Sequence, residues 1–278
     1  MSNRAVDLLR HSWRVNSWRP LVLGGLDAVA RGPVSAFWQR QMPWYAGKFV
    51  EHRGSVVTID GCRLDVSAPT FSTFQRGCFW LQRHEEPERI AVARFLDPDL
   101  PVIELGASTG LLSCLIGRRL RRPDQHVAVE ANPDLIAVLE RNRSLNGGSF
   151  SIVHAALAYD VAAIEFTRGE DHLAGRAKAN GRAESPIDGV TLRQLLDRFA
   201  FSRATLVCDI EGMEVDVWRR ERDTIVDRIP WLIVELHEPI SGAEAVNGLI
   251  HEVQEAGFTL MWERGWTRVF ARSAKPRT

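Results

Sequence analysis

The segment from Val102 to Ile116 constrains the fold of this chain more than any other. It begins with the strand-like residues 102–105, continues through the loop Gly106-Ala107-Ser108-Thr109-Gly110 and ends in an apolar helical turn, 111–116. A buried strand that enters a helix through a glycine loop is the entrance to a nucleotide-binding site. The segment therefore predicts a parallel sheet covered by helices, with a ligand crevice beside this loop.

An acidic residue further along the chain supports this interpretation. The next apolar strand, His126 to Val129, ends at Glu130, which stands 20 residues after Gly110. An acid at about this distance beyond the loop accepts the hydroxyl groups of an adenosine ribose. An ordinary glycine turn between a strand and a helix is the alternative, and it does not account for the position of Glu130.

The loop also favours one class of cofactor. A dinucleotide site uses glycine at the position of Ser108, where the backbone closes on a pyrophosphate, and Glu104 would repel that group. S-adenosylmethionine has no phosphate, and its ammonium and sulfonium groups are positively charged. The pattern therefore favours S-adenosylmethionine, with a nicotinamide-dependent dehydrogenase as the alternative enzyme class.

Composition sets the broad class of the protein. The 278 residues are 45% apolar, which is enough for a substantial core, and 35 acidic residues balance 35 basic ones. A net charge of zero gives no basic surface field, so we expect no nucleic-acid partner. The four cysteines (Cys62, Cys78, Cys114 and Cys208) lack the spacing of a metal site and fit a reducing cytoplasm.

The N-terminal part of the chain is rich in tryptophan and arginine. No apolar run reaches the roughly 20 residues that span a bilayer, and no signal-peptide pattern is present, so we expect a cytoplasmic protein. Between Leu8 and Tyr45 the residues of these two types are Trp13, Trp18, Trp38, Trp44, Arg10, Arg14, Arg19, Arg31 and Arg40. We interpret this segment as a helical flap on its own domain; peripheral contact with a membrane face or a lipid-like substrate is the alternative.

Apolar patterning divides the rest of the chain into alternating strands and helices. Asp60-Gly61 predicts a β-hairpin over 56–66, and a helix over 85–95 leads into the glycine strand. The predicted strands are 102–105, 126–130, 150–154, 205–210 and 231–236, with a weaker one at 164–166, and the predicted helices are 110–120, 134–145, 192–199, 215–227 and 243–256. A hairpin of 258–261 with 267–271 adds an antiparallel strand, and 168–184 is predicted to be a mobile loop over a substrate.

These elements predict a doubly wound α/β fold with a mostly parallel sheet. Its right-handed crossovers place the ligand crevice at the carboxyl ends of the strands. We predict a helical and β-hairpin extension over residues 1–70 and a Rossmann-like domain over 71–278.

Several motifs together resemble the FkbM family of S-adenosylmethionine-dependent methyltransferases, a class I, Rossmann-like family. The resemblance covers about three quarters of the chain, from Phe71 onward. Its motifs are 102–110, Glu130-Ala131-Asn132-Pro133, Asn142 with Asn146, Thr191-Leu192, Asp209-Ile210-Glu211-Gly212-Met213-Glu214 and Val234-Glu235-Leu236-His237-Glu238. The family usually has Asp, Pro and Lys where this chain has Glu104, Ala131 and Cys208.

The resemblance implies a seven-stranded sheet with an antiparallel last strand. It also implies methylation of a hydroxyl group on a sugar, polyketide or glycolipid-type metabolite. A cofactor-binding module without catalytic activity, whose N-terminus binds a lipid or protein partner, is the alternative outside enzymes.

We expect the cofactor to lie along the first two parallel strands. The glycine loop would surround its methionine half, with Glu104 near the ammonium and Glu130 on the ribose. Asn132 would lie near the adenosine, although Asn132 before Pro133 also suits a helix start. The predicted cofactor-binding residues are Glu104, Gly106, Ala107, Ser108, Thr109, Gly110, Glu130, Ala131, Asn132, Ala155 and Ala156.

Methyl transfer to a hydroxyl needs an acceptor oxygen aligned about 3 Å from the methyl carbon and a group that takes its proton. Asp209, Glu235 and His237 stand at the ends of apolar strands, so we predict them as catalytic residues, with His237 or Asp209 as the base. The alternatives are a helix cap for Asp209 and a loop contact for His237. The same three residues would hold a divalent cation if one binds, although we favour catalysis without a metal.

Overall fold

The computed structural model describes residues 33–159, 163–168, 175–178 and 187–272, with the backbone alone for 33–39, 163–168 and 175–178. The predicted flap therefore lies partly outside the described residues, including Trp13 and Trp18. The part within them is helix α3 (Pro33–Arg53).

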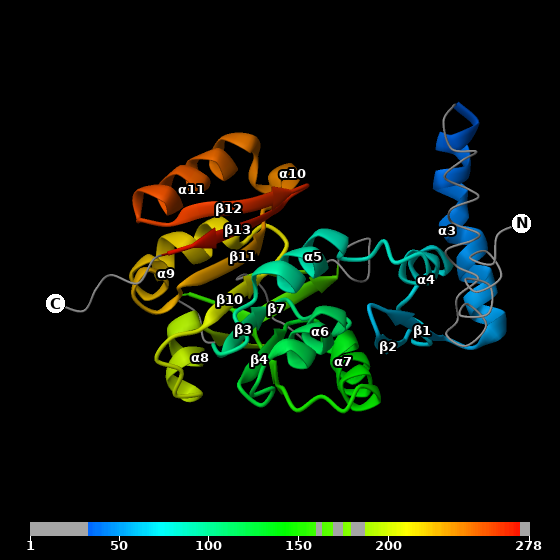
Figure 1. Cartoon of the computed structure of the whole chain (residues 1–278), viewed down its shortest axis with the longest axis horizontal. Helices are drawn as coiled ribbons and strands as arrows, with labels where there is room; N and C mark the ends of the chain where they lie inside the picture. Colours follow the sequence, from blue (N-terminus) through cyan, green and yellow to red (C-terminus); the bar gives the residue numbers. More distant parts are fainter. Residues whose placement is uncertain (1–32, 160–162, 169–174, 179–186, 273–278) are drawn as a thin grey trace, which may run out of the picture.

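A seven-stranded sheet lies at the centre of the molecule (Figure 1), and its strand order is β12-β13-β11-β10-β3-β4-β5. The five parallel strands are β3 (Val102–Leu105), β4 (His126–Glu130), β5 (Ser151–His154), β10 (Thr205–Cys208) and β11 (Trp231–Glu235). Strand β13 (Thr267–Ala271) enters antiparallel between β11 and β12 (Thr259–Arg264). The predicted fold, a mostly parallel seven-stranded sheet with an antiparallel last strand, is confirmed.

Helices cover both faces of this sheet. They are α5 (Glu86–Phe95), α6 (Leu111–Arg119), α7 (Pro133–Leu145), α8 (Leu192–Arg198), α9 (Glu214–Arg228), the short α10 (Glu238–Ser241) and α11 (Ala243–Glu255). Alternate residues of β3 pack into different cores: Ile103 and Leu105 contact the side of α8, α9 and α11, whereas Val102 contacts the side of α5 and α6. Because both faces are covered, the central strands are mostly apolar, with Glu104 of β3 and His126 of β4 as buried exceptions.

The order of the strands reverses at β3. The chain proceeds outward from β3 to β4 and β5, and then returns to the other side of β3 to form β10 and β11. In open parallel sheets a ligand crevice opens at such a switch point, outside the carboxyl ends of the strands. The fold therefore places Gly106, which follows β3, and Asp209, which follows β10, at the same edge.

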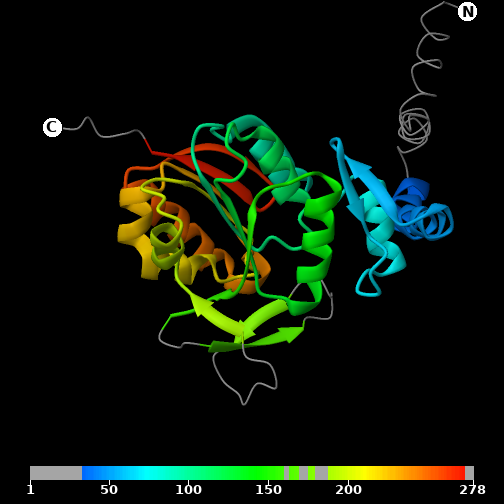
Figure 2. The same cartoon turned by 90° about the horizontal axis from the view of Figure 1, so that it is seen from below.

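A second sheet of four short strands lies along one side of the domain, green and yellow-green in Figure 2. Its order is β6 (Ala156–Leu157), β9 (Ile187–Val190), β7 (Ala163–Arg168) and β8 (Gly175–Lys178). The weaker predicted strand at 164–166 is present within β7. The predicted loop over 168–184 is wrong at residues 175–178, which pair antiparallel with β7; most of the remainder lies outside the described residues.

The β-hairpin predicted around Asp60-Gly61 is present as β1 (Val56–Ile59) and β2 (Cys62–Asp65). Both turn residues have positive φ, 47° and 83°, which matches the right-handed twist of a two-residue hairpin. The inward side chains of the hairpin, including Ile59 and Leu64, share one apolar core with Leu111 of α6 and Leu139 of α7.

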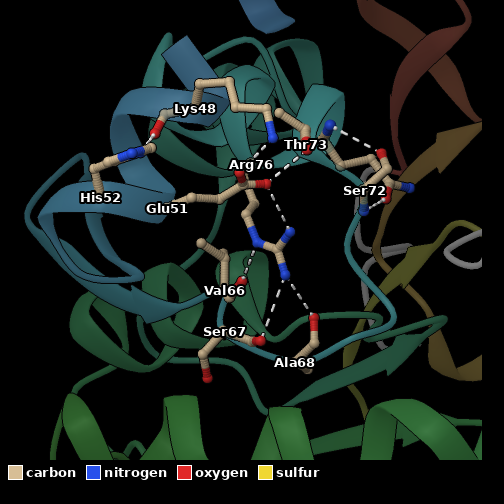
Figure 3. Close-up of polar contacts among 10 residues, drawn as sticks. Lys48, Glu51, His52, Val66, Ser67, Ala68, Ser72, Thr73 and Arg76 are labelled. Atoms are coloured by element: carbon tan, nitrogen blue, oxygen red, sulfur yellow. Dashed lines mark hydrogen bonds and ion pairs between the residues drawn. The ribbon is translucent and has the colours of Figure 1, made fainter. Parts of the chain in front are cut away.

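Helix α4 (Thr73–Trp80), which the sequence analysis did not predict, follows the hairpin and packs on α3. Figure 3 shows how Arg76 fixes it: Nε donates to the carbonyl of Val66 at 2.9 Å and Nη2 to that of Ala68 at 3.1 Å. The Arg76 Nη1 atom lies 3.3 Å from Glu51 of α3. The two helices are also close at Gly77, where a Cβ atom would lie 1.6 Å from the carbonyl oxygen of Pro43.

All four cysteines are free thiols. Burial raises the pKa of Cys62 to about 11 and that of Cys114 to about 12. Both therefore stay protonated at neutral pH and pack as small apolar side chains, as the sequence predicts for Cys114. In the part of the chain that the structure describes, no helix has the length and apolar character needed to cross a membrane.

Candidate functional site

A cavity of about 550 Å³ opens at the carboxyl ends of β3, β4, β5, β10 and β11, where the predicted crevice lies. This volume is within the range of small-molecule and cofactor sites, roughly 300–1,000 Å³. Residues after the five strands form its floor, and α4 with the start of α5 forms a wall. The predicted site residues that line it are Gly106, Ser108, Glu130, Ala131, Ala155, Ala156, Asp209, Glu235 and His237.

Gly106 allows the loop to approach the end of β10. Its φ is +86°, and a Cβ atom there would lie 1.7 Å from the backbone oxygen of Asp209. Of the other predicted contacts in the loop, Ser108 lines the cavity, whereas the remaining three residues do not. Ala107 packs in the apolar core, Thr109 is fully buried, and Gly110 lies against Leu139.

Glu130 is held at the cavity by the backbone. Its side chain accepts hydrogen bonds from the amides of Ser108 and Asn132, both at 2.6 Å, and the residue is 7% exposed. Burial raises its pKa above the ordinary glutamate value, and hydrogen bonds from the backbone amides of Asn132, Ser108 and Ala131 oppose that shift. Each carboxylate oxygen retains a lone pair that can accept a further hydrogen bond from a ligand.

Of the cofactor-binding residues predicted beyond Glu130, three line the cavity and one does not. Ala131, Ala155 and Ala156 line the cavity with small side chains that leave room for a flat ring. Asn132 does not line it, and its side chain instead accepts a hydrogen bond from the amide of Asp134 at 3.0 Å, as the N-cap of α7. The helix-start alternative for Asn132 is therefore the one observed.

The structure corrects the prediction for Glu104. The residue is 1% exposed and does not line the cavity, because strand alternation directs it toward α6. Its Oε2 accepts a hydrogen bond from Ser113 at 2.6 Å and lies 2.8 Å from Nε2 of His126. Because Glu104 does not reach the cavity, it makes no direct contact with a ligand there and is no argument for one cofactor class over the other.

The three predicted catalytic residues lie together. Nε2 of His237 lies 3.5 Å from Oδ1 of Asp209 and 4.0 Å from Oε2 of Glu235. Burial, reinforced by the charge of Glu235, raises the pKa of Asp209 well above its ordinary value. Burial and the charge of Glu88 raise the pKa of Glu235 to about 7.

Glu214 orients the ring of His237, a contact that the sequence analysis did not predict. Its Oε1 lies 2.8 Å from Nδ1 of His237 and also accepts the amides of Gly212 and Ile210, at 3.1 and 3.3 Å. Burial alone would lower the pKa of His237, but the hydrogen bond and charge of Glu214 leave it raised. The loop-contact alternative for His237 is therefore not what the structure shows.

Other acidic residues that the sequence analysis did not assign to the site also line the cavity. Oε2 of Glu211 lies 3.5 Å from Nε2 of His237, and Glu88 accepts a hydrogen bond from the hydroxyl of Thr267. Glu88 lies in the first turn of α5, and Glu85 is the N-cap residue that precedes this helix. The predicted helix over 85–95, which leads into the glycine strand, is the signal that a sequence search could have used.

The cavity has an excess of acidic groups. Seven carboxyl side chains line it (Glu85, Glu86, Glu88, Glu130, Asp209, Glu211 and Glu235), against one guanidinium and two imidazoles (Arg83, His84 and His237). Such a lining attracts a cationic ligand and repels a polyanion.

No family model matches the sequence, and no curated protein matches it. The resemblance to the FkbM family therefore stays a prediction. Among solved structures, the chain is similar to M. jannaschii TYW2 in complex with AdoMet, with 14% identity, a TM-score of 0.40, and coverage of 78% of this chain and 86% of that one.

It is also similar to precorrin-6y C5,15-methyltransferase from Geobacter metallireducens, with 12% identity, a TM-score of 0.40, and coverage of 67% and 86%. An rRNA methylase from Streptococcus thermophilus has 10% identity, a TM-score of 0.42, and coverage of 66% and 93%. Because all three TM-scores are below 0.5, the fold assignment rests on the strand order of this chain itself.

Proposed function

We propose that this protein is an S-adenosylmethionine-dependent methyltransferase that acts on a hydroxyl group of a small metabolite. The observation that carries this proposal is the acid-rich cavity at the switch point of the sheet, with Glu130 held beside the glycine loop. A sulfonium and an ammonium suit such a lining, whereas the pyrophosphate of a nicotinamide cofactor does not.

The residues present fit the cofactor. S-adenosylmethionine supplies a methyl group that is already activated by its positive sulfur. Glu130 has free lone pairs for the two ribose hydroxyls, and the positive φ of Gly106 lets the loop backbone approach the methionine half. Ala155 and Ala156 leave space for the adenine ring.

The remaining wall of the cavity suits an organic acceptor. The aromatic side chains of Phe74, Phe79 and Trp266 also line it. With the cofactor bound, the acceptor oxygen would form a bond to its methyl carbon while the bond from that carbon to sulfur breaks, and the hydroxyl proton would pass to a nearby base. Asp209, Glu235 and His237 are the groups placed to take that proton.

Calorimetry with S-adenosylhomocysteine tests the proposal. We expect micromolar binding to the wild-type protein and at least tenfold weaker binding to Glu130→Ala, since the variant lacks the acceptor for the ribose hydroxyls. Glu140→Ala is the matched control, because Glu140 is an exposed residue of α7. An absence of binding to the wild type, or stabilisation by a nicotinamide dinucleotide instead, would contradict the proposal.

A further inference from the structure

We propose that Asp209, Glu211 and His237 form a binding site for one divalent metal ion at the floor of the cavity. Each residue offers one ligand atom, and the three atoms all lie within 4.8 Å of one another. They come from the end of β10, the loop that follows it and the end of β11, so the central sheet fixes two of the three. This set differs from the sequence-based one in having Glu211 in place of Glu235.

The hydrogen bonding of His237 prepares its ring as a metal ligand. An ionised carboxylate can only accept a hydrogen bond, so the contact between Glu214 and Nδ1 places the ring proton on Nδ1. In the neutral ring Nε2 then carries a lone pair that faces Asp209 and Glu211. Metal-binding histidines are commonly fixed in this way by a carboxylate on the other ring nitrogen.

The side chain of Glu214 is held in the position from which it contacts His237. Its Oε1 also accepts the amides of Ile210 and Gly212, and the residue is almost fully buried. His237 is only 6% exposed, so its Nε2 is aimed into the cluster and not toward bulk solvent.

The facing atoms of this cluster make only long contacts with one another. Nε2 of His237 lies 3.5 Å from Oδ1 of Asp209 and 3.5 Å from Oε2 of Glu211, which is the outer limit of a hydrogen bond. The Oδ1 atom of Asp209 is buried and has no hydrogen-bond partner. Lone pairs that converge in this way repel one another unless a cation lies between them.

The spacing suits a metal ion. Nε2 of His237 and a carboxylate oxygen that lies 3.5 Å from it could both bind one ion at about 2.1 Å. The angle between these two ligand atoms at the metal would then be roughly 110°. A proton on Nε2 is the competing occupant, and it can bond well to only one of the two carboxylates. The nearby carboxylates of Glu235, Glu85 and Glu88 add negative charge that favours the doubly charged ion.

The ligand set indicates the class of metal. Two carboxylates and one imidazole suit hard or borderline ions such as Mg²⁺ and Mn²⁺. Because the protein supplies three ligands, further coordination positions stay open toward the cavity for water or for an oxygen of the acceptor. Metal binding at this site does not require the proposed methyl transfer. With an ion bound, Asp209 and His237 would serve as ligands, and Glu235 would be the residue of the three left to take the proton of an acceptor hydroxyl.

Titration of the full-length, chelator-treated protein with MnCl₂, followed by loss of the electron paramagnetic resonance signal of free Mn²⁺, tests the site. We expect one bound ion per chain at micromolar to submillimolar Mn²⁺. Asp209→Asn and Glu211→Gln preserve shape and should each weaken binding at least tenfold. Glu86→Gln is the matched control, because Glu86 lines the same cavity but is half-exposed and paired with Arg264, so binding should not change.

A second comparison separates ligands from general charge. Glu235→Gln removes a neighbouring carboxylate that is not in the ligand set, and it should weaken binding less than Glu211→Gln does. Equal losses in the two variants would overturn the site, because they would indicate diffuse attraction. The site would also be overturned if the wild-type protein, shown by circular dichroism to be folded, bound no Mn²⁺. A proton shared among the three groups would then be the occupant.

The same samples, free of metal, are titrated with S-adenosylhomocysteine. Binding of S-adenosylhomocysteine without Mn²⁺ binding rejects the metal site and keeps the proposed function. Binding of Mn²⁺ alone, lost in Asp209→Asn and Glu211→Gln, supports the metal site and rejects the proposed cofactor.

Discussion

Gly106 is the residue on which the shape of the cavity depends most directly. Its backbone lies against the carbonyl of Asp209, so the loop after β3 and the end of β10 meet without a side chain between them. Two physical requirements coincide there, a positive φ and a close backbone approach. Any other residue would bring a Cβ atom into that carbonyl and would hold a backbone conformation that side chains rarely adopt.

We therefore predict that Gly106→Ala destabilises the protein by at least about 2 kcal/mol, since the added Cβ meets backbone and the left-handed conformation is unfavourable for alanine. Gly248→Ala is the matched control. Gly248 lies in α11, where an added Cβ atom would meet nothing within 4 Å and φ is not positive, so alanine should stabilise the helix by about 0.5–1 kcal/mol. Urea unfolding of both variants measures the two effects, and a Gly106→Ala protein as stable as wild type would contradict the argument.

At this scale the sequence predicted some site residues and not others. The spacing of Glu130 from the glycine loop is local information, and the structure places Glu130 at the cavity. Glu104 was misplaced because the period of two along a strand decides which face a residue occupies. Glu88 was missed, and Glu85 was not assigned to the site, because the start of α5 reaches the cavity only through tertiary packing.

Helix α4 shows what sequence patterns omit at the level of elements. It has only eight residues and contains Gly77 in its interior, so its length and composition do not mark it as a helix. Its start signal is nevertheless present, because Ser72 and Gln75 form a reciprocal capping box. This short helix supplies Phe74, Cys78 and Phe79 to the cavity wall, so its anchoring bears on the acceptor side of the site.

We predict that Arg76→Ala destabilises the protein by about 2–3 kcal/mol, because the carbonyls of Val66 and Ala68 lose a charged donor. Lys48→Ala is the control, since Lys48 contacts the same Glu51 from an exposed position (Figure 3). Exposed ion pairs contribute little, so this variant should unfold close to wild type. Chemical denaturation compares the two, and equal effects would show that Arg76 acts only through Glu51.

The five parallel strands of the large sheet were predicted to within two residues because buried parallel strands are mostly apolar along their length. Strand β8, by contrast, has the sequence Gly-Arg-Ala-Lys, and no alternation marks it. Residues 175–178 form a strand because they pair with β7, and their own sequence does not indicate it.

At the scale of the whole molecule, the N-terminal hairpin and the main sheet share a core. Leu64 and Ile59 of the hairpin lie in the same apolar cluster as Leu111 and Leu139. A boundary near residue 70 stays a prediction from the pattern of elements and from the family resemblance. The shared core leads us to propose that both sides of it unfold together.

Leu64→Ala tests this proposal. We expect a loss of about 2–5 kcal/mol in a single transition, since Leu64 is fully buried in the shared core. Val56→Ala in the same hairpin is the control, and because Val56 is 46% exposed its effect should be small. Circular dichroism and tryptophan fluorescence should report the same midpoint. Two separate transitions, with only one moved by Leu64→Ala, would argue for independent domains.

The convergence of Asp209, Glu211 and His237 is a property of the whole fold that no local pattern contains. Two adjacent strands must pair in parallel and in register before these side chains meet. From the sequence, residues at strand ends could be predicted as candidates. The conformation of the loop after β10 decides whether Glu211 or Glu235 lies with Asp209 and His237, and the sequence pattern does not indicate it.

The insertion of β13 between β11 and β12 has a consequence for biosynthesis. Strand β11, which carries Glu235 and leads to His237, gains its outer neighbour only from residues 267–271, which the ribosome makes after β12. Until then the backbone donors and acceptors along that border are open to pairing with other chains. Maturation of the cavity is thus tied to a late event in translation, and a chain stalled before Thr267 would be a natural target for chaperones.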